Sequence, residues 1–162
     1  MIFENVFNKV YDREVLAKVK FLSTVSLFKG ISKKDLLYLL ENIYENKYRK
    51  GDIVFEEGEV GRALFIVYSG TIGLYKKNDK NNIIYKVKPG EFVGEMAIFE
   101  EMPRTLSAVA IEDTSVFMFY KTDLESIITS KPKIAAYLNY NLAKILSQRL
   151  RGYIKGEKEI VE

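Results

Sequence analysis

The sequence contains no cysteine, no histidine and no tryptophan among its 162 residues. Without cysteine no disulfide can form, which favours a cytoplasmic location. The joint lack of cysteine and histidine excludes thiolate nucleophiles, imidazole bases and ordinary zinc sites. No apolar run approaches the roughly 20 residues of a membrane span, and the N-terminus shows no secretion signal. We therefore expect a cytoplasmic protein that is not an enzyme and holds no metal.

A strong excess of one charge sign is also lacking, because 25 basic residues nearly balance 22 acidic ones. The formal net charge of +3 is too small to imply nucleic-acid binding by itself. One local bias occurs in residues 131–155, which include no acidic residue. A solvated helix face is the plain interpretation, and a contact surface for an acidic partner is the alternative. The basic residues of this segment are Lys131, Lys133, Lys144, Arg149, Arg151 and Lys155.

The middle of the chain, from Tyr44 onward, shows the period-two pattern of short β-strands. Residues 63–68 are apolar throughout, which predicts a buried strand, and the polar residues 77–82 predict a hairpin tip. Glycines fall at corners between strands, whereas Gly73 falls inside a strand. It predicts a β-bulge, and close approach of a ligand is the alternative. Many short strands between glycine corners indicate an antiparallel sandwich or barrel.

Helical patterns flank the β region on both sides. Residues 2–20 show helical spacing, either as a helix packed on the domain or as an arm that couples it to something else. Ser32 and Asp35 form a capping-box pattern at the start of a second helix. Leucines recur every four residues in a last helix, 133–154, whose broad apolar face can serve two surfaces.

The length predicts one domain. We expect residues 1–20 to form an N-terminal helical arm and residues 21–155 to form the domain, including the last helix. Residues 156–162 are expected to be a frayed, charged tail.

Residues 90–108 have the chemistry of an anion site. Gly94 permits a positive φ or a close backbone approach, and the composition after it favours one helical turn, whose first amides lack intrahelical partners. Arg104 adds a planar fork of donors suited to phosphate, although an ion pair with Glu95, Glu100 or Glu101 is the structural alternative. The Glu95 carboxylate can accept from hydroxyls. These groups together suit a sugar phosphate.

This stretch resembles the phosphate-binding cassette of the cyclic nucleotide-binding domain family, the module of bacterial catabolite-activator-type regulators, cyclic-nucleotide-dependent kinases and cyclic-nucleotide-gated channels. The resemblance covers roughly residues 20–152, including the corner glycines upstream. Its core is Phe92-Val93-Gly94-Glu95-Met96-Ala97, followed by Pro103-Arg104-Thr105-Leu106-Ser107-Ala108.

The resemblance implies a mainly β fold with flanking helices (α+β). In detail, it implies an antiparallel β jelly-roll (double-stranded β-helix) barrel with N-terminal helices and a long C-terminal helix. It also implies cAMP or cGMP as the ligand, no cofactor, and a homodimer formed through the C-terminal helix.

The same resemblance implies roles for single residues. Glu95 would accept from the ribose 2′-hydroxyl, Arg104 would pair with the cyclic phosphate, and Thr105 would reach the phosphate or the purine, where a threonine hints at cGMP. The residues expected to offer backbone amides are Gly94, Met96 and Ala97. The candidates for the base pocket are Val93, Leu106, Ile83 and Leu74, with Tyr137, Asn139 and Asn141 as candidates to cap the base.

The expected function is a regulatory or sensor domain that transmits ligand occupancy through its C-terminal helix, using a hinge near Lys131-Pro132. Leu106 stands where the family usually has alanine or threonine. It motivates the alternative, an interaction and dimerisation domain that has lost its ligand. Because the chain ends at Glu162, without a helix-turn-helix, we expect no direct contact with nucleic acid, and we expect none with a membrane. The downstream partner and the direction of the switch stay open.

Overall fold

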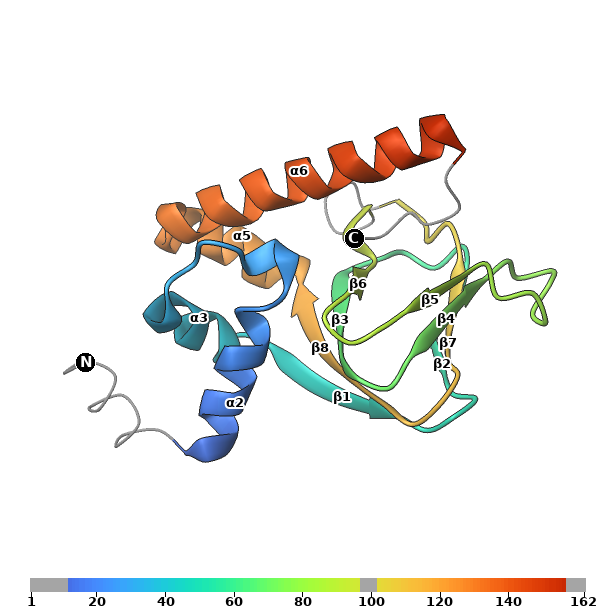
Figure 1. Cartoon of the computed structure of the whole chain (residues 1–162), viewed down its shortest axis with the longest axis horizontal. Coiled ribbons are helices and arrows are strands. Elements are labelled where there is room, and N and C mark those ends of the chain that lie inside the picture. The colour runs from blue at the N-terminus through green and yellow to red at the C-terminus, as the bar shows by residue number, and fades with distance from the viewer. Residues whose placement is uncertain (1–11, 97–101, 157–162) are drawn as a thin grey trace.

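The computed structural model describes residues 12–96 and 102–156. Within these ranges two four-stranded antiparallel sheets form a sandwich, with strand orders β1-β8-β3-β6 and β2-β7-β4-β5 (Figure 1). This arrangement confirms the expected jelly roll with flanking helices. The strands are β1 (Tyr44–Tyr48), β2 (Ile53–Phe55), β3 (Ala63–Ser69), β4 (Ile72–Tyr75), β5 (Tyr85–Val87), β6 (Phe92–Val93), β7 (Ser107–Ala110) and β8 (Thr114–Tyr120).

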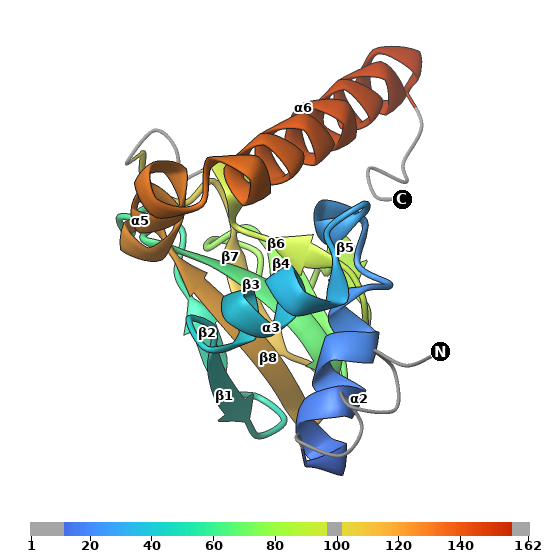
Figure 2. The same ribbon diagram turned by 90° about the vertical axis from the view of Figure 1, so that its left-hand side faces the viewer.

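The helices gather against the β1-β8-β3-β6 sheet, and Figure 2 shows α2 and α3 in front of β3 and β8. Among the described residues, no helix combines the length and the apolar character needed to cross a membrane. The helices are α2 (Arg13–Leu22), the 3₁₀ turn η1 (Ser26–Phe28), α3 (Lys33–Leu40), α5 (Lys121–Ser130) and α6 (Pro132–Lys155).

The position of β3 between two apolar cores explains why its sequence is apolar throughout and does not alternate between apolar and polar residues. Successive side chains of a strand point to opposite faces. Leu64 and Ile66 pack among the helices, whereas Phe65 and Val67 pack inside the sandwich. Both faces of β3 are therefore buried, and the sheet has one apolar core on each side.

The N-terminal helices belong to the helical core. Val19 and Leu22 of α2 are buried in it. The capping role predicted for Ser32 is confirmed, because its hydroxyl accepts from the Asp35 amide at 3.2 Å and donates to the Asp35 carboxylate at 2.7 Å. The part of the predicted first helix before residue 12 lies outside the described residues. The expected division of the chain at residue 20, which falls within α2, stays a prediction.

Helix α6 runs across the top of the sandwich in Figure 1. It is separated from α5 by one non-helical residue, Lys131, with φ −137° and ψ 62°. Pro132 follows at the first helical position, where its missing N–H leaves no bond unmade. The helix predicted over 133–154 is thus confirmed within two residues, and its start is a break in the helical backbone where a hinge can form.

The predicted β-bulge at Gly73 is wrong. Gly73 pairs in regular register with Lys86 on one side and Val109 on the other. A Cβ added there would lie 2.9 Å from side-chain atoms of Ile83 and Ile111. The glycine therefore makes room for two neighbouring side chains and does not interrupt the ladder.

Candidate functional site

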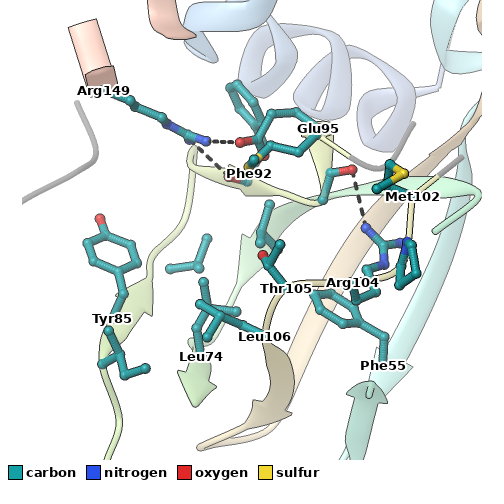
Figure 3. Close-up of a pocket in the computed structure, with 16 residues that line it drawn as sticks. Phe55, Leu74, Tyr85, Phe92, Glu95, Met102, Arg104, Thr105, Leu106 and Arg149 are labelled. Atoms are coloured by element: carbon teal, nitrogen blue, oxygen red, sulfur yellow. Dashed lines mark hydrogen bonds and ion pairs between the residues drawn. The ribbon is translucent and has the colours of Figure 1, made fainter. Parts of the chain in front are cut away.

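A cavity of about 450 Å³ lies where the sandwich meets the C-terminal half of α6 (Figure 3). Pockets for small ligands commonly measure about 300–1,000 Å³ and are mostly apolar with a few polar groups. Strands of both sheets supply the wall, together with the chain before β7 and one side chain of α6. In Figure 3, Glu95 and Arg104 lie toward one side and Leu74 and Tyr85 toward the other.

Most residues that the sequence analysis selected line this one cavity. Ala97 lies outside the described residues. The selected residues in the wall are Val93, Gly94, Glu95, Met96, Arg104, Thr105, Leu106 and Leu74.

Ile83 is not part of the cavity wall, so its assignment to the base pocket is wrong; Ile84 lines the cavity instead. Ile72 and Leu74 point into the sandwich, which leaves Gly73 on the opposite face of β4. Ile83 packs against Gly73 on that outer face. Adjacent residues of an extended chain point in opposite directions, so a one-residue step exchanges the two isoleucines.

Arg104 is only 7% exposed and is held tightly from several sides. Its Nη1 donates to the Gly94 carbonyl at 3.2 Å and its Nη2 donates to the Ala63 carbonyl at 2.7 Å. The guanidinium carbon lies 4.4 Å from the centroid of the Phe55 ring, a cation–π geometry. Burial lowers the pKa of Arg104, while the charges of Glu95 and Glu59 act in the opposite direction.

Gly94 is needed for this arrangement. It has φ +93°, a region that L side chains rarely adopt. A Cβ added there would collide with the Arg104 guanidinium and would lie 3.0 Å from the Ala63 carbonyl oxygen. The glycine proposed for close backbone approach thus lets the arginine lie against the cassette backbone.

Glu95 forms an ion pair with Arg149 of α6, and not with Arg104. Arg149 Nη1 donates to Glu95 Oε1, and Nη2 donates to the Phe92 carbonyl at 3.3 Å. The guanidinium carbon also lies 5.1 Å from the Phe92 ring centroid. The Arg149 and Glu95 side chains are 13% and 7% exposed, so this pair is largely buried.

Sequence reasoning missed Arg149 as a site residue. The solvated-face interpretation fits the other basic residues of 131–155, which are exposed, but it is wrong for Arg149. A signal existed, because Arg149 follows the buried Leu142 and Ile145 by seven and four residues. Those spacings place all three on one helix face.

The residues of α6 that were candidates to cap the base lie elsewhere. Tyr137 packs against Gly30. Asn141 Nδ2 donates to the carbonyls of Leu27 and Lys29 at 2.9 and 2.8 Å. Asn139 borders a separate apolar hollow that Leu27 also lines. These residues hold the first half of α6 on η1, and among the described residues Arg149 alone brings α6 to the cavity wall.

The position of Leu106 resolves an alternative left open by the sequence. Leu106 both packs against the sandwich core and lines the cavity, so its bulk narrows the pocket. Met96 also lines the cavity and is 59% exposed. Phe55 and Phe92, which sequence reasoning did not select, also line the wall.

Comparison with known proteins gives a consistent result. A model of the family described as cyclic nucleotide-binding domain matches residues 45–131. The chain is 32% identical over 127 residues to a cyclic AMP receptor protein from Thermus thermophilus, covering 77% of this chain and 57% of that protein. It is 28% identical over 134 residues to a CRP-like cAMP-activated global transcriptional regulator from Mycobacterium tuberculosis, covering 82% and 58%.

A solved structure supports the same relationship. The crystal structure of the Thermus thermophilus catabolite activator protein superposes with a TM-score of 0.72 at 30% identity, covering 81% of this chain and 61% of that one. The chain therefore spans less than two thirds of these curated relatives.

Proposed function

The chain belongs to the cyclic nucleotide-binding domain family, and from this premise we propose that its cavity binds cAMP or cGMP. One observation carries the proposal: a buried guanidinium and a buried carboxylate, Arg104 and Glu95, border the same largely apolar cavity. A cyclic nucleotide matches this combination: its phosphate suits the guanidinium, its sugar hydroxyl suits the carboxylate, and its flat base suits the apolar wall.

The phosphate is assigned to Arg104 and to the backbone amides of Gly94 and Met96, because Ala97 lies outside the described residues. A guanidinium has five N–H donors, so a phosphate can bond Arg104 while its bonds to Gly94 and Ala63 persist. Charge-assisted bonds of this kind contribute roughly 1.5–3 kcal/mol each. The ribose 2′-hydroxyl is assigned to Glu95, and the base lies against apolar wall residues, with Leu74, Val93 and Leu106 as the nearest choices.

Helix α6 is the element proposed to report occupancy. Its first half is fixed by buried residues such as Ile134 and Leu138 and by the bonds of Asn141. Its second half reaches the cavity through Arg149. A ligand with different affinities for two positions of this second half shifts the equilibrium between them. The hinge expected near Lys131-Pro132 lies at the other end of the helix, next to the fixed first half, and stays a prediction.

A second function is favoured by two observations, the bulk of Leu106 in the cavity and the apolar outer face of α6. In this alternative the chain is a dimerising interaction domain without a ligand. Both functions include a homodimer through α6. The exposed apolar residues of that helix are Tyr137, Tyr140, Leu146, Leu150, Tyr153 and Ile154.

Isothermal titration with cAMP and with cGMP tests the proposed function. We expect saturable binding of at least one nucleotide to the wild type, and a loss of about 10- to 150-fold in affinity for Arg104→Gln. Arg62→Gln is the matched control, because Arg62 is exposed and adjoins the Ala63 carbonyl that Arg104 bonds. Absence of heat and of any thermal shift with both nucleotides at millimolar concentration would favour the ligand-free alternative.

A further inference from the structure

Thr105 and Leu106 form a bend in the cavity wall just before β7 begins. Both residues line the cavity, and Figure 3 draws them between Arg104 and Leu74. The two residues share one peptide bond, so the orientation of that peptide helps to decide where both side chains lie. Whatever holds this peptide therefore acts on the shape of the cavity.

The bend begins where the pairing of β4 with β7 stops. The Ile111 amide donates to the Thr71 carbonyl at 3.0 Å, which makes these two residues a hydrogen-bonded pair at the start of β4. In an antiparallel sheet such pairs recur at every second residue. Continued past the ends of both strands, this register would make Lys77 and Thr105 the next bonded pair.

Side chains bond the backbone groups that this next pair would have joined. The Lys77 amide donates to Glu57 Oε2 at 2.9 Å, and Lys76 Nζ donates to the Thr105 carbonyl at 3.0 Å. Lys76 Nζ also lies 3.9 Å from Glu57 Oε1. Because a lysine and a glutamate satisfy these backbone groups, the chain at Thr105 can leave the ladder and bend along the cavity without losing its hydrogen bonds.

The residues on both sides of the bend are anchored to the turn at residues 57–59. Arg104 forms two backbone hydrogen bonds with this turn, of 2.7 and 2.9 Å. Ser107 Oγ accepts from a backbone amide of the same turn at 2.9 Å. Between these two anchors, Lys76 bonds the Thr105 carbonyl from the opposite side, the start of the β4–β5 hairpin.

We propose that Lys76 is a positioning residue for the nucleotide site, which holds Thr105 and Leu106 in place at the cavity through the Thr105 carbonyl. This inference rests on the proposed function. Glu57 supports Lys76 and offsets its positive charge, so Lys76 acts through the geometry of the bend and not through attraction of the phosphate. Without the lysine, the peptide between Thr105 and Leu106 is free to rotate away from its position in the wall.

Isothermal titration with cAMP and cGMP tests the role of Lys76. We expect Lys76→Met to lower the affinity of the nucleotide that binds the wild type by about 2- to 12-fold, because one hydrogen bond to the cavity wall is lost. Lys77→Met is the matched control. It removes the same charge from the adjacent residue, whose side chain is also more than half exposed and pairs with Glu56 at 3.7 Å. Its backbone amide is unchanged, so its affinity should equal that of the wild type.

A conservative variant and a second readout separate positioning from a loss of charge or of stability. Lys76→Arg keeps a charged donor within reach of the Thr105 carbonyl and should keep most of the wild-type affinity. Urea unfolding should give similar midpoints for Lys76→Met and Lys77→Met, because both lysines are exposed. Hydrogen exchange of residues 104–107 in the nucleotide-free protein should be faster in Lys76→Met and unchanged in Lys77→Met.

The outcomes are distinguishable. Equal affinities of Lys76→Met and the wild type would overturn the role of Lys76 and leave the proposed function standing. Equal weakening by Lys76→Met and Lys77→Met would show a general charge effect and would also overturn it, as would a loss in Lys76→Arg as large as in Lys76→Met. Failure of the wild type to bind either nucleotide would reject the proposed function, and hydrogen exchange of the nucleotide-free variants would still decide whether Lys76 holds the bend.

Discussion

At the scale of single residues, the site depends on how closely Arg104 approaches the cassette backbone. The guanidinium lies against Gly94 and Phe55 and bonds the Ala63 carbonyl. Such a position is available only if residue 94 has no side chain. Residue 94 must therefore be glycine for two reasons, a positive φ and the lack of space for a side chain. Gly90 shares only the first reason, so a comparison of the two glycines separates the two effects.

We expect Gly94→Ala to destabilise the protein and to weaken nucleotide binding strongly, because Arg104 must move. Gly90→Ala is the matched control: its φ is +88°, close to +93° at Gly94, but nothing lies within 4 Å of an added Cβ. Both variants carry backbone strain of about 1–3 kcal/mol. Urea unfolding and titration calorimetry should show a larger loss of stability, and a loss of affinity, for Gly94→Ala only. Equal effects of the two substitutions would contradict the close-approach argument.

Thr105 lines the cavity beside Arg104. A comparison of cGMP with cAMP can distinguish a bond from its hydroxyl to the base from a bond to the phosphate. If its hydroxyl bonds the guanine amino group, as the resemblance implies, Thr105→Ala should lower cGMP affinity by about 2- to 12-fold and cAMP affinity less. Thr105→Ser keeps the hydroxyl and serves as the control. An equal loss for both nucleotides would instead place the hydroxyl at the phosphate.

At the scale of elements, an ion pair ties α2 to the sheet. Lys18 of α2 bonds Glu45 of β1 at 2.7 Å, and Ser115 of β8 donates to the same carboxylate at 3.2 Å. Bonds to Glu14 and Glu45 raise the pKa of Lys18, and the bond from Lys18 lowers the pKa of Glu45 below its usual 4.5. The pair therefore stabilises the fold between the two titrations.

The pH dependence follows from these directions. The contribution of Glu45 is present above pH 4.5 and is lost as the pH falls through its lowered pKa. We expect Glu45→Gln to cost about 0.5–1 kcal/mol near neutral pH, as for a partly exposed pair. As the pH falls below 4.5 through the lowered pKa, the cost should shrink, because the carboxylate becomes protonated in the folded state as well as in the unfolded state. Urea unfolding over an acid pH series measures this, and a cost independent of pH would argue against the ion pair.

Local patterns in the sequence predicted the elements well. The Ser32 cap, the apolar strand β3 and the long helix α6 each depend on residues close in the chain. The register of single side chains was harder. Ile83 and Ile84 have similar chemistry, and only the pairing of β4 with β5 decides which one reaches the cavity.

The partner of Arg149 could not be read from any local pattern. The pair joins residues 54 positions apart, and its formation depends on how α6 crosses the sandwich. Neighbouring Arg151 has the same chemistry and is exposed. Arg149 lies on the helix face that meets Phe92 and Glu95. Which residues meet that face depends on the three-dimensional arrangement of α6 on the sandwich.

At the scale of the whole molecule, the outer face of α6 is the proposed dimer contact. Leu150 and Ile154 are 59% and 73% exposed and lie four residues apart on one helix face. We expect the double variant Leu150→Glu/Ile154→Glu to convert a dimer to a monomer in sedimentation experiments. Ile128→Glu on α5, also an exposed apolar residue at 44%, should leave the dimer intact. A monomeric wild type would contradict the proposed contact.

The central claim is that one cavity binds a cyclic nucleotide between the cassette and α6. A crystal structure of the protein with the tighter-binding nucleotide tests it most directly. We expect phosphate oxygens within hydrogen-bond distance of Arg104, and the ribose hydroxyl on a Glu95 that still contacts Arg149. A nucleotide bound with its phosphate away from Arg104, or outside this cavity, would overturn the claim.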